Sequence, residues 1–170
     1  ATAVLTAYSL ILSKKELKQI YDFKSKWIII GVISAIVLYL VFFIGNEVSR
    51  LLFDFTEKQV NNVYSTKEQA SQIFIGLALF FWIGPAEEIF WRGFAQHELS
   101  KRIGDNAAWI VNSIIYALVH IWAFNFMLFM AALICGLFWG WMFKNYKSLI
   151  PALISHSVWD VAIFIILPIT

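Results

Sequence analysis

The sequence is poor in charged residues and in residues that interrupt helices or form disulfides. Of its 170 residues only 14% are charged, three are proline and one is cysteine. A soluble domain carries about 25% charged residues, so an ordinary soluble protein is excluded. The single cysteine, Cys135, excludes an intramolecular disulfide framework, and its apolar neighbours predict a buried side chain without a chemical role. The small net charge of +2 gives no reason to expect nucleic acid as a partner.

Apolar and aromatic residues dominate the chain instead. Hydrophobic residues make up 61% of it and aromatic residues 18%, and the mean hydropathy is +0.74. This composition predicts an all-α, multi-pass transmembrane helical bundle whose immediate partner is the lipid bilayer. No internal repeat, low-complexity stretch or linker divides the chain, so residues 1–170 are expected to form a single membrane-embedded helical domain.

About five segments have the length of a membrane-spanning helix, which needs roughly twenty apolar residues. They are Trp27–Gly45, Ile73–Ser100, Ala107–Trp122, Phe124–Phe143 and Ser148–Ile169. Ala1–Leu12 is apolar but too short to span, and we expect it to be the end of a truncated first helix. Asn46–Gln72 has apolar residues near helical spacing, and it either prolongs the preceding helix or lies along the membrane interface. Gly84-Pro85 is expected to break or kink its helix.

Positive charge predicts the orientation of the bundle. If the segments alternate in direction, the loops on one side hold Lys14, Lys15, Lys18, Lys24, Lys26, Arg92, Lys101, Arg102, Lys144 and Lys147, and those on the other hold Arg50, Lys58 and Lys67. Cytoplasmic loops of membrane proteins are enriched in lysine and arginine. The larger set is therefore predicted to be cytoplasmic, which places Glu87 toward the cytoplasmic half of its helix.

Glu87, Glu88 and Arg92 follow a run, residues 73–84, that has no charge at all. Ionisable side chains inside a membrane segment cost roughly 2.5–3.5 kcal/mol each on insertion scales, so they indicate a functional site. On a helix, Glu88 and Arg92 are four residues apart and are expected to form an ion pair on one face. Glu87 points about 100° away and lacks that partner. A carboxylate left unpaired in a dry site is suited to act as a base.

Two further polar spots interrupt the apolar segments. Tyr116 and His120 are spaced to share a helix face, and so are His156 and Asp160, which can hydrogen-bond to each other. Taken singly, each group has a structural explanation, such as an ion pair, an interfacial histidine or a polar pair that ties helices together. Taken together, three segments carry groups that activate water, and a bundle core gathers such groups into a catalytic or ligand site. His97 lies near basic residues at the expected membrane surface and is left out of this site.

Three motifs succeed one another: Glu-Glu-x-x-x-Arg, aromatic-x-x-x-His and His-x-x-x-Asp. Their residues are Glu87, Glu88 and Arg92, then Tyr116 and His120, then His156 and Asp160. In this order and spacing they resemble the CAAX protease and bacteriocin-processing family of intramembrane proteases, which includes the CAAX prenyl endopeptidases. The resemblance places a family-like catalytic core at about 73–161. The family usually has Phe where Tyr116 stands and Asn where Asp160 stands.

The resemblance implies an intramembrane endopeptidase in which Glu87 and His120 activate a water molecule, with no cofactor and no covalent enzyme intermediate. His156 with Asp160 would stabilise the oxyanion. Because an ionised carboxylate cannot donate a hydrogen bond, Asp160 is either protonated or orients His156. The supporting residues would be Glu88, Arg92 and Tyr116. The substrate would be a peptide or a membrane-anchored protein, either of the CAAX type or a peptide precursor.

Two alternatives stay open. A zinc-dependent intramembrane protease would use Glu87, His120 and His156 as ligands, because two histidines and a carboxylate are a known catalytic ligand set. Against zinc, no His-Glu-x-x-His motif occurs and Cys135 has no second cysteine beside it. The other alternative is a non-catalytic immunity or binding protein on the same scaffold. A transporter is less favoured because the sequence shows no matching halves with broken helices.

Overall fold

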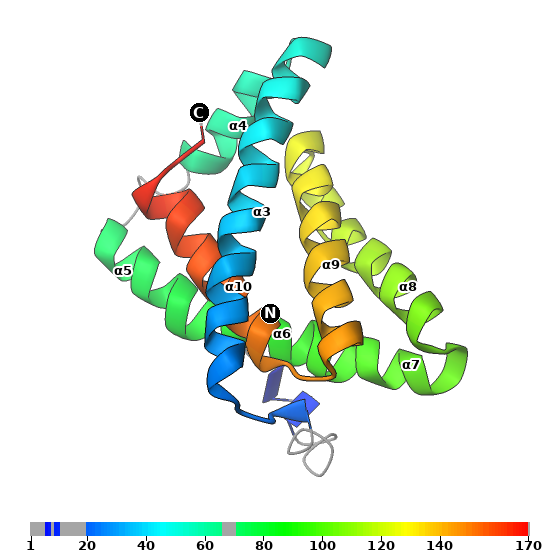
Figure 1. Ribbon diagram of the computed structural model, residues 1–170. Helices are drawn as coiled ribbons and strands as arrows, with labels where there is room; N and C mark the ends of the chain where they lie inside the picture. Colours follow the sequence, from blue (N-terminus) through cyan, green and yellow to red (C-terminus); the bar gives the residue numbers. More distant parts are fainter. Residues whose placement is uncertain (1–5, 8, 11–19, 66–70, 170) are drawn as a thin grey trace.

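The computed structural model describes residues 6–7, 9–10, 20–65 and 71–169, and within these ranges it contains helices and no strand. In chain order the helices are α3 (Ser25–Leu52), α4 (Thr56–Ser65), α5 (Gln72–Ala78), η2 (Leu79–Ile83), α6 (Gly84–Glu88), η3 (Ile89–Gln96), α7 (His97–Ile103), α8 (Asp105–Leu118), η4 (Ile121–Ala123), α9 (Phe126–Tyr146), α10 (Ile150–Val161) and η5 (Ala162–Ile166) (Figure 1). The prediction of an all-α helical bundle is confirmed. The truncated helix predicted over Ala1–Leu12 falls largely outside the described residues.

Four helices are long and apolar enough to cross a membrane, and they make this an integral membrane protein. They run over Ser25–Leu52, Gln72–Ile103, Asp105–Ala123 and Phe126–Tyr146. The fifth predicted span, Ser148–Ile169, contains a shorter apolar helix formed by α10 and η5. Pro151 stands in the first turn of α10, where its missing N–H is not needed by the helix.

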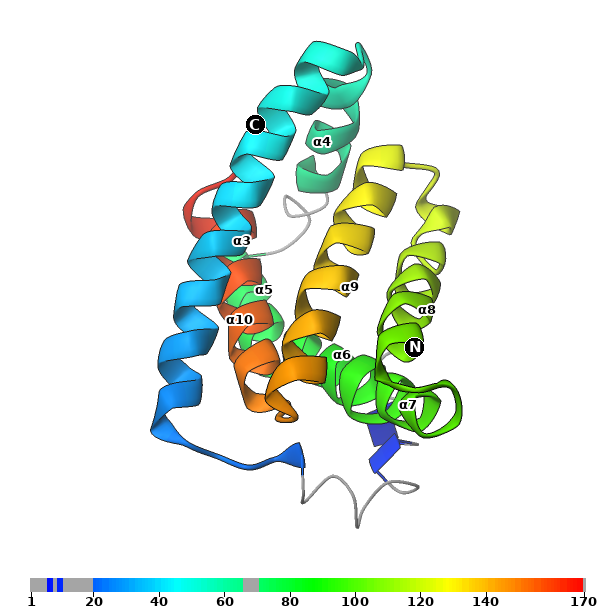
Figure 2. The ribbon, with the colours of Figure 1, turned by 45° about the vertical axis from the view of Figure 1, so that its right-hand side comes forward.

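The helices surround a core that is shared by distant parts of the chain. α8 and α9 lie side by side in opposite directions, and α10 packs against α3 (Figures 1 and 2). The helix composed of α5, η2, α6, η3 and α7 crosses obliquely near the end of the bundle where α3 begins and α9 ends. Leu38 of α3, Trp139 and Met142 of α9, and Trp159 of α10 are buried in the core between them.

Glycines let two helix pairs approach closely. A Cβ added at Gly31 of α3 would lie 2.7 Å from Ile154 of α10, and one added at Gly140 of α9 would lie 2.8 Å from Trp109 of α8. Real side chains do not approach so closely, and small residues are the usual solution at tight helix contacts in membranes. The contact at Gly140 sets the distance between α9 and the helix that carries Tyr116.

Gly84-Pro85 does not end its helix, so of the expected break or kink the break is wrong. Residues Gln72–Ile103 form one continuous helix, which widens into the π-helical η2 just before this dipeptide. The Gly84 N–H bonds to the Leu79 carbonyl, five residues back. A wider turn is one way for a helix to accommodate a residue that lacks an N–H. A second π-helical stretch, η3, follows Glu88, so both glutamates lie in a short α-helical turn between two wider ones.

The mixed segment Asn46–Gln72 divides into two helices. α3 continues to Leu52, which confirms that the first part of the segment prolongs the preceding helix. α4 follows as a separate helix and packs against the start of α9. There the Gln59 carbonyl accepts from Asn125 Nδ2 at 2.8 Å, and Gln59 Oε1 accepts from the Met127 N–H at 3.0 Å.

Most described basic residues of the larger predicted set lie at one end of the bundle, where α3 begins, α7 ends and α9 ends. At this end Lys147 pairs with Asp105 at 2.7 Å and joins α9 to α8. Arg50 lies toward the other end of α3. Arg92 was wrongly counted with the loop charges, because it is fully buried against Glu88. Lys14, Lys15, Lys18 and Lys67 lie outside the described residues.

Candidate active site

Glu88 joins two buried side chains, the guanidinium of Arg92 and the imidazole of His156. Its Oε1 accepts from Arg92 Nη1 at 2.7 Å and from His156 Nδ1 at 2.8 Å. Glu88 and Arg92 are both 0% exposed, and His156 is 4% exposed. The first contact confirms the predicted ion pair, whereas the second, which reaches from α6 to α10, was not predicted. Buried charges need such partners because each has lost its contact with water.

The Arg92 guanidinium is enclosed by aromatic rings and by the backbone of α9. Its Nη2 donates to the carbonyl of Cys135 at 3.4 Å, and Cys135 itself is buried as predicted. Its Cζ lies 4.9 Å from the ring centre of Tyr116 and 5.4 Å from that of Trp139. Aromatic faces attract a nearby cation. Arg92 therefore links its own helix, which also carries Glu87 and Glu88, to α8 and α9.

His156 and Asp160 lie one turn apart on α10. His156 Nε2 is 3.5 Å from Asp160 Oδ2, so the two side chains face each other as the spacing predicts. An ionised carboxylate only accepts hydrogen bonds, so the His156 Nδ1 that faces Glu88 carries a proton. The Trp139 ring stacks on the imidazole, with ring centres 3.8 Å apart and an angle of 16° between the planes.

Glu87 is half-buried and faces away from the Arg92–Glu88 pair. Its Oε2 accepts a hydrogen bond from the Tyr116 hydroxyl at 2.9 Å. The prediction that Glu87 lacks an arginine partner agrees with this geometry, but its bond to Tyr116 was not foreseen. Tyrosine at this position, in place of the phenylalanine usual in the family that the sequence resembles, supplies a donor that phenylalanine lacks.

His120 lies in the turn after α8 rather than on the helix. Its Nδ1 is 2.8 Å from the carbonyl of Tyr116, and the two rings meet edge to face with their centres 5.0 Å apart. A carbonyl only accepts, so Nδ1 donates and the neutral ring keeps Nε2 as its acceptor. The sequence spacing predicts Tyr116 and His120 on one helix face. In the structure α8 ends at Leu118, between the two residues, but their side chains are still adjacent.

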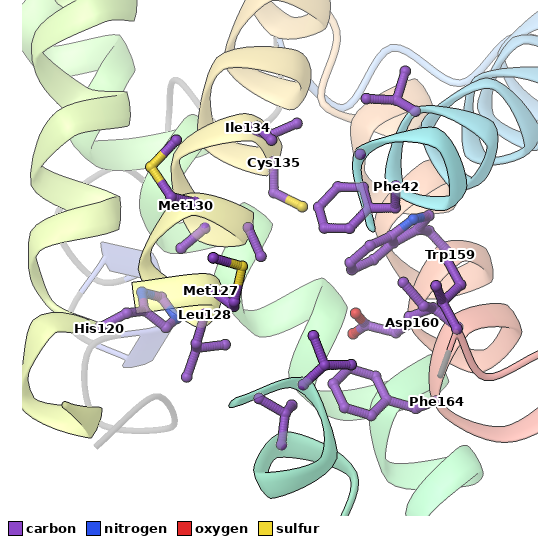
Figure 3. Close-up of a pocket in the computed structure, with 18 of the residues that line it drawn as sticks. Phe42, His120, Met127, Leu128, Met130, Ile134, Cys135, Trp159, Asp160 and Phe164 are labelled. Carbon is purple, nitrogen blue, oxygen red and sulfur yellow. The ribbon is translucent and has the colours of Figure 1, made fainter. Parts of the chain in front are cut away.

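One pocket of about 350 Å³ brings the predicted residues together. Its wall includes Glu87, Tyr116, His120, His156 and Asp160. Figure 3 shows His120 and Asp160 on opposite sides of this pocket. Glu88 and Arg92 are buried behind the wall. His97 is not part of the wall, and its ring packs beside that of Phe143 at 6.4 Å.

Most of the rest of the pocket wall is apolar and comes from several helices. Phe42 of α3, Met127 and Met130 of α9, and Phe164 of η5 contribute to it (Figure 3). Val60 of α4 also lines it. Apolar walls exclude water and strengthen the electrostatic interactions of the few polar groups among them. A site of this form suits acid–base chemistry on a substrate with apolar parts.

The residues suggested for zinc do not fit a metal ion in this arrangement. Among the described residues, no three His, Cys, Asp or Glu side chains are grouped so that they could hold one. A zinc ion held by Glu87, His120 and His156 therefore receives no support from the geometry.

Sequence reasoning missed Trp139 and the contact between Glu88 and His156. Both depend on how α9 and α10 pack against α6, which residue spacing along one helix does not reveal. A signal that could have pointed to Trp139 is its place between Gly136 and Gly140, because glycines four residues apart allow helices to pack closely.

The fold and these contacts define a multi-pass helical membrane protein with acid–base residues gathered in a pocket among its helices. A family model, described as type II CAAX prenyl endopeptidase Rce1-like, matches residues 69–162, which is more than half of the chain. The chain belongs to this family, and membership assigns it in general terms to the intramembrane CAAX-type endopeptidases. All seven motif residues lie within the matched range. No curated protein and no solved structure gives a significant match to the chain.

Proposed function

We propose that this protein hydrolyses a peptide bond with a water molecule that Glu87 and His120 activate. The observation that supports this pairing most is the double role of Tyr116. Its hydroxyl donates to Glu87 Oε2 at 2.9 Å, and its carbonyl accepts from His120 Nδ1 at 2.8 Å. One residue thus fixes both groups on the wall of the same pocket.

These bonds leave one acceptor on each residue for the water. Glu87 keeps Oε1, and His120 keeps the unprotonated Nε2 of its neutral ring. A water molecule that donates to both is held for attack on the peptide carbonyl carbon. Glu87 takes a proton from it as the C–O bond forms, and then delivers that proton to the amine that leaves when the C–N bond breaks.

His156 and Asp160 would act on the carbonyl oxygen. As negative charge develops there, the Nε2–H of a doubly protonated His156 ring would donate to the oxyanion. Preorganised donors of this kind are typically worth about 3–4 kcal/mol of the barrier. Asp160, 3.5 Å from the same Nε2, would orient His156 as an acceptor that shares this N–H with the oxyanion, because an ionised carboxylate cannot donate. Glu88 would hold the other ring nitrogen and keep Nε2 directed into the pocket.

The substrate would be a peptide or a membrane-anchored protein. It would reach the pocket from the end of the bundle where α3 ends and α9 begins, because Gly45, Val60 and Met127 line the pocket there. The family description names CAAX prenyl endopeptidases, whose substrates end in cysteine, two aliphatic residues and a variable residue. The apolar part of the pocket would accept the aliphatic residues or a lipid attached to the cysteine.

The test is cleavage of quenched fluorescent peptides by the purified protein in detergent or nanodiscs. One peptide carries a farnesylated CAAX ending, a second carries the same ending without the lipid, and a third is a scrambled control. We expect cleavage of at least one CAAX peptide, unchanged by a chelator and absent in Glu87→Gln. Activity that disappears with the chelator and returns with zinc would overturn the metal-free mechanism. Saturable binding of a peptide without cleavage would favour the non-catalytic alternative.

A further inference from the structure

Trp139 is the largest fully buried side chain in the described part of the protein, and it contacts the site from α9. Its ring lies nearly parallel to that of His156, 3.8 Å from centre to centre at an angle of 16°. The same indole lies 5.4 Å from the Arg92 Cζ. It therefore contacts both hydrogen-bonding partners of Glu88.

The hydrogen bond from His156 to Glu88 does not by itself fix the imidazole. A single bond at Nδ1 is a pivot about which the ring can tilt, and a tilt swings Nε2 through the pocket. The contact between Nε2 and Asp160 is looser, at 3.5 Å. A flat surface stacked on the ring removes this freedom, because tilting would separate the two faces or drive them into each other.

The Trp139 indole is hydrogen-bonded to α10, the helix that carries His156. Trp139 Nε1 donates to the Ser155 hydroxyl at 3.1 Å, and Ser155 immediately precedes His156 on α10. Movement of α10 relative to α9 therefore carries the stacked surface and the imidazole together. An aromatic face also favours a positively charged ring above it over a neutral one.

We propose that Trp139 is a positioning residue for His156, which it holds with Nε2 directed toward the reacting carbonyl, and that Ser155 keeps the Trp139 indole in place. This inference rests on the proposed function of His156 as the oxyanion donor. It adds a residue that acts on the reaction through the orientation of that ring.

The first test follows the His156 ring without any substrate. The chain has three histidines, so ring-labelled protein gives a simple NMR spectrum that His97→Gln and His120→Gln variants assign. Wild type should show a slowly exchanging Nδ1–H of His156, held by Glu88. Trp139→Leu should lose this signal to fast exchange, whereas Trp139→Phe, which retains a flat ring, should keep it.

Trp27→Leu is the matched control. Trp27 is also buried, at 6% exposure, and also packs on another ring, that of Tyr146 at 5.4 Å, but it is not part of the pocket wall. It should lose a comparable amount of thermal stability while the His156 signal persists. If Trp139→Leu keeps the signal as Trp27→Leu does, the proposal is overturned.

The second test measures CAAX-peptide cleavage per folded molecule. Misplacing a reacting group by about 1 Å can cost roughly a hundredfold in rate, so Trp139→Leu should lower kcat roughly tenfold to a hundredfold with KM nearly unchanged. Trp139→Phe should restore most of the loss. A loss confined to KM, or wild-type kcat in Trp139→Leu, would contradict the role.

Ser155→Ala keeps the proposal testable if Trp139→Leu does not fold. It removes only the acceptor of the indole N–H, and it should speed exchange of the His156 Nδ1–H and lower kcat several-fold. Wild-type behaviour of Ser155→Ala in both measurements would overturn the proposal. If wild type cleaves none of the peptides, the proposed function fails, but the NMR comparison still decides whether Trp139 positions His156.

Discussion

Glu88 and His156 are joined by a hydrogen bond of 2.8 Å although 68 residues separate them in the sequence. The same Glu88 oxygen accepts from Arg92 at 2.7 Å, so one buried carboxylate binds both a guanidinium and an imidazole. The second glutamate of the Glu-Glu pair is therefore not only a structural partner of its own helix. It links the helix that carries Glu87 to the helix that carries the proposed oxyanion donor.

The first prediction follows from this shared oxygen. Glu88→Gln leaves the buried Arg92 guanidinium and the His156 imidazole facing a neutral amide, and breaking a buried ion pair costs roughly 3–5 kcal/mol. We expect a lower melting temperature and a loss of activity in the same variant. Thermal unfolding followed by intrinsic fluorescence, together with peptide cleavage, measures both.

Glu98→Gln is the matched control for Glu88→Gln. Glu98 pairs with Lys101 at 2.6 Å on the same continuous helix, but both side chains are partly exposed to the surroundings. Exposed ion pairs contribute about 0–1 kcal/mol, so this variant should unfold close to wild type. If Glu88→Gln and Glu98→Gln lower the melting temperature equally, the buried ion pair contributes no more to stability than the exposed one.

Glu87→Gln should behave in the opposite way. The amide oxygen of glutamine can still accept the bond from the Tyr116 hydroxyl, so the fold and the melting temperature should be retained. The amide cannot take a proton from water, so turnover should be abolished. If both glutamine variants, at Glu87 and at Glu88, keep equal activity and the wild-type melting temperature, the assignment of Glu87 as the base is wrong.

Tyr116→Phe separates the hydroxyl of Tyr116 from its backbone carbonyl. The substitution removes the donor to Glu87 Oε2 but keeps the carbonyl that holds His120. The family usually has phenylalanine at this position, so we expect the variant to fold and to cleave peptide. A hydrogen bond to a charged group contributes about 1.5–3 kcal/mol, and a kcat reduced about tenfold is the expected result. Complete loss of turnover would show that the hydroxyl takes part in the chemistry itself.

Spacing along single helices predicted the part of the site that helix geometry alone determines. The Glu88–Arg92 pair and the facing of His156 and Asp160 follow from residues four apart on one helix. The all-α membrane fold followed from the composition and the long apolar runs, because a bilayer admits few other structures. These inferences needed no knowledge of which helices touch.

The contacts between helices were not predictable in the same way. The Tyr116–Glu87 and Glu88–His156 bonds depend on the crossing of separate helices, and a periodic pattern indicates a face without naming its partner. The count of basic loop residues included Arg92, although Arg92 lies within the predicted segment Ile73–Ser100. Burial against Glu88 made it part of the core instead.

Close packing of α8 on α9 gives a prediction about geometry. A Cβ at Gly140 would lie 2.8 Å from Trp109 Cδ1 and 2.9 Å from Gln96 Oε1. Gly140→Ala should therefore force α8 away from α9, with a loss of about 1–3 kcal/mol in stability. Because α8 leads to Tyr116 and His120, cleavage should fall as well, as measured per folded molecule.

Gly76→Ala serves as the control for Gly140→Ala. A Cβ at Gly76 would meet Ile165 Cγ1 at 3.6 Å, an ordinary contact, and alanine favours the helix by up to about 1 kcal/mol over glycine. This variant should be as stable as wild type or more so, with unchanged cleavage. Tolerance of alanine at both positions would show that the tight α8–α9 contact is not required.

Asp160 is the position where the chain departs from the usual family pattern in a way that touches the mechanism. Its Oδ2 lies 3.5 Å from His156 Nε2, on the side of the ring opposite the bond to Glu88. If Asp160 orients His156 as an acceptor, Asp160→Asn keeps a side chain of the same shape with an oxygen that can still accept. We expect this variant to retain substantial activity, with a changed dependence of rate on pH because the charge beside the ring is gone.

Asp160→Ala should be far less active than Asp160→Asn, because it removes the acceptor altogether and leaves a buried polar ring without that partner. Leaving such a group unsatisfied costs about 1–3 kcal/mol, and the ring also gains freedom to turn. Rate-versus-pH curves for wild type and both variants on one CAAX peptide separate the two effects. If the asparagine variant is as inactive as the alanine variant, the carboxylate itself takes part in the chemistry, and the orienting role of Asp160 has to be abandoned.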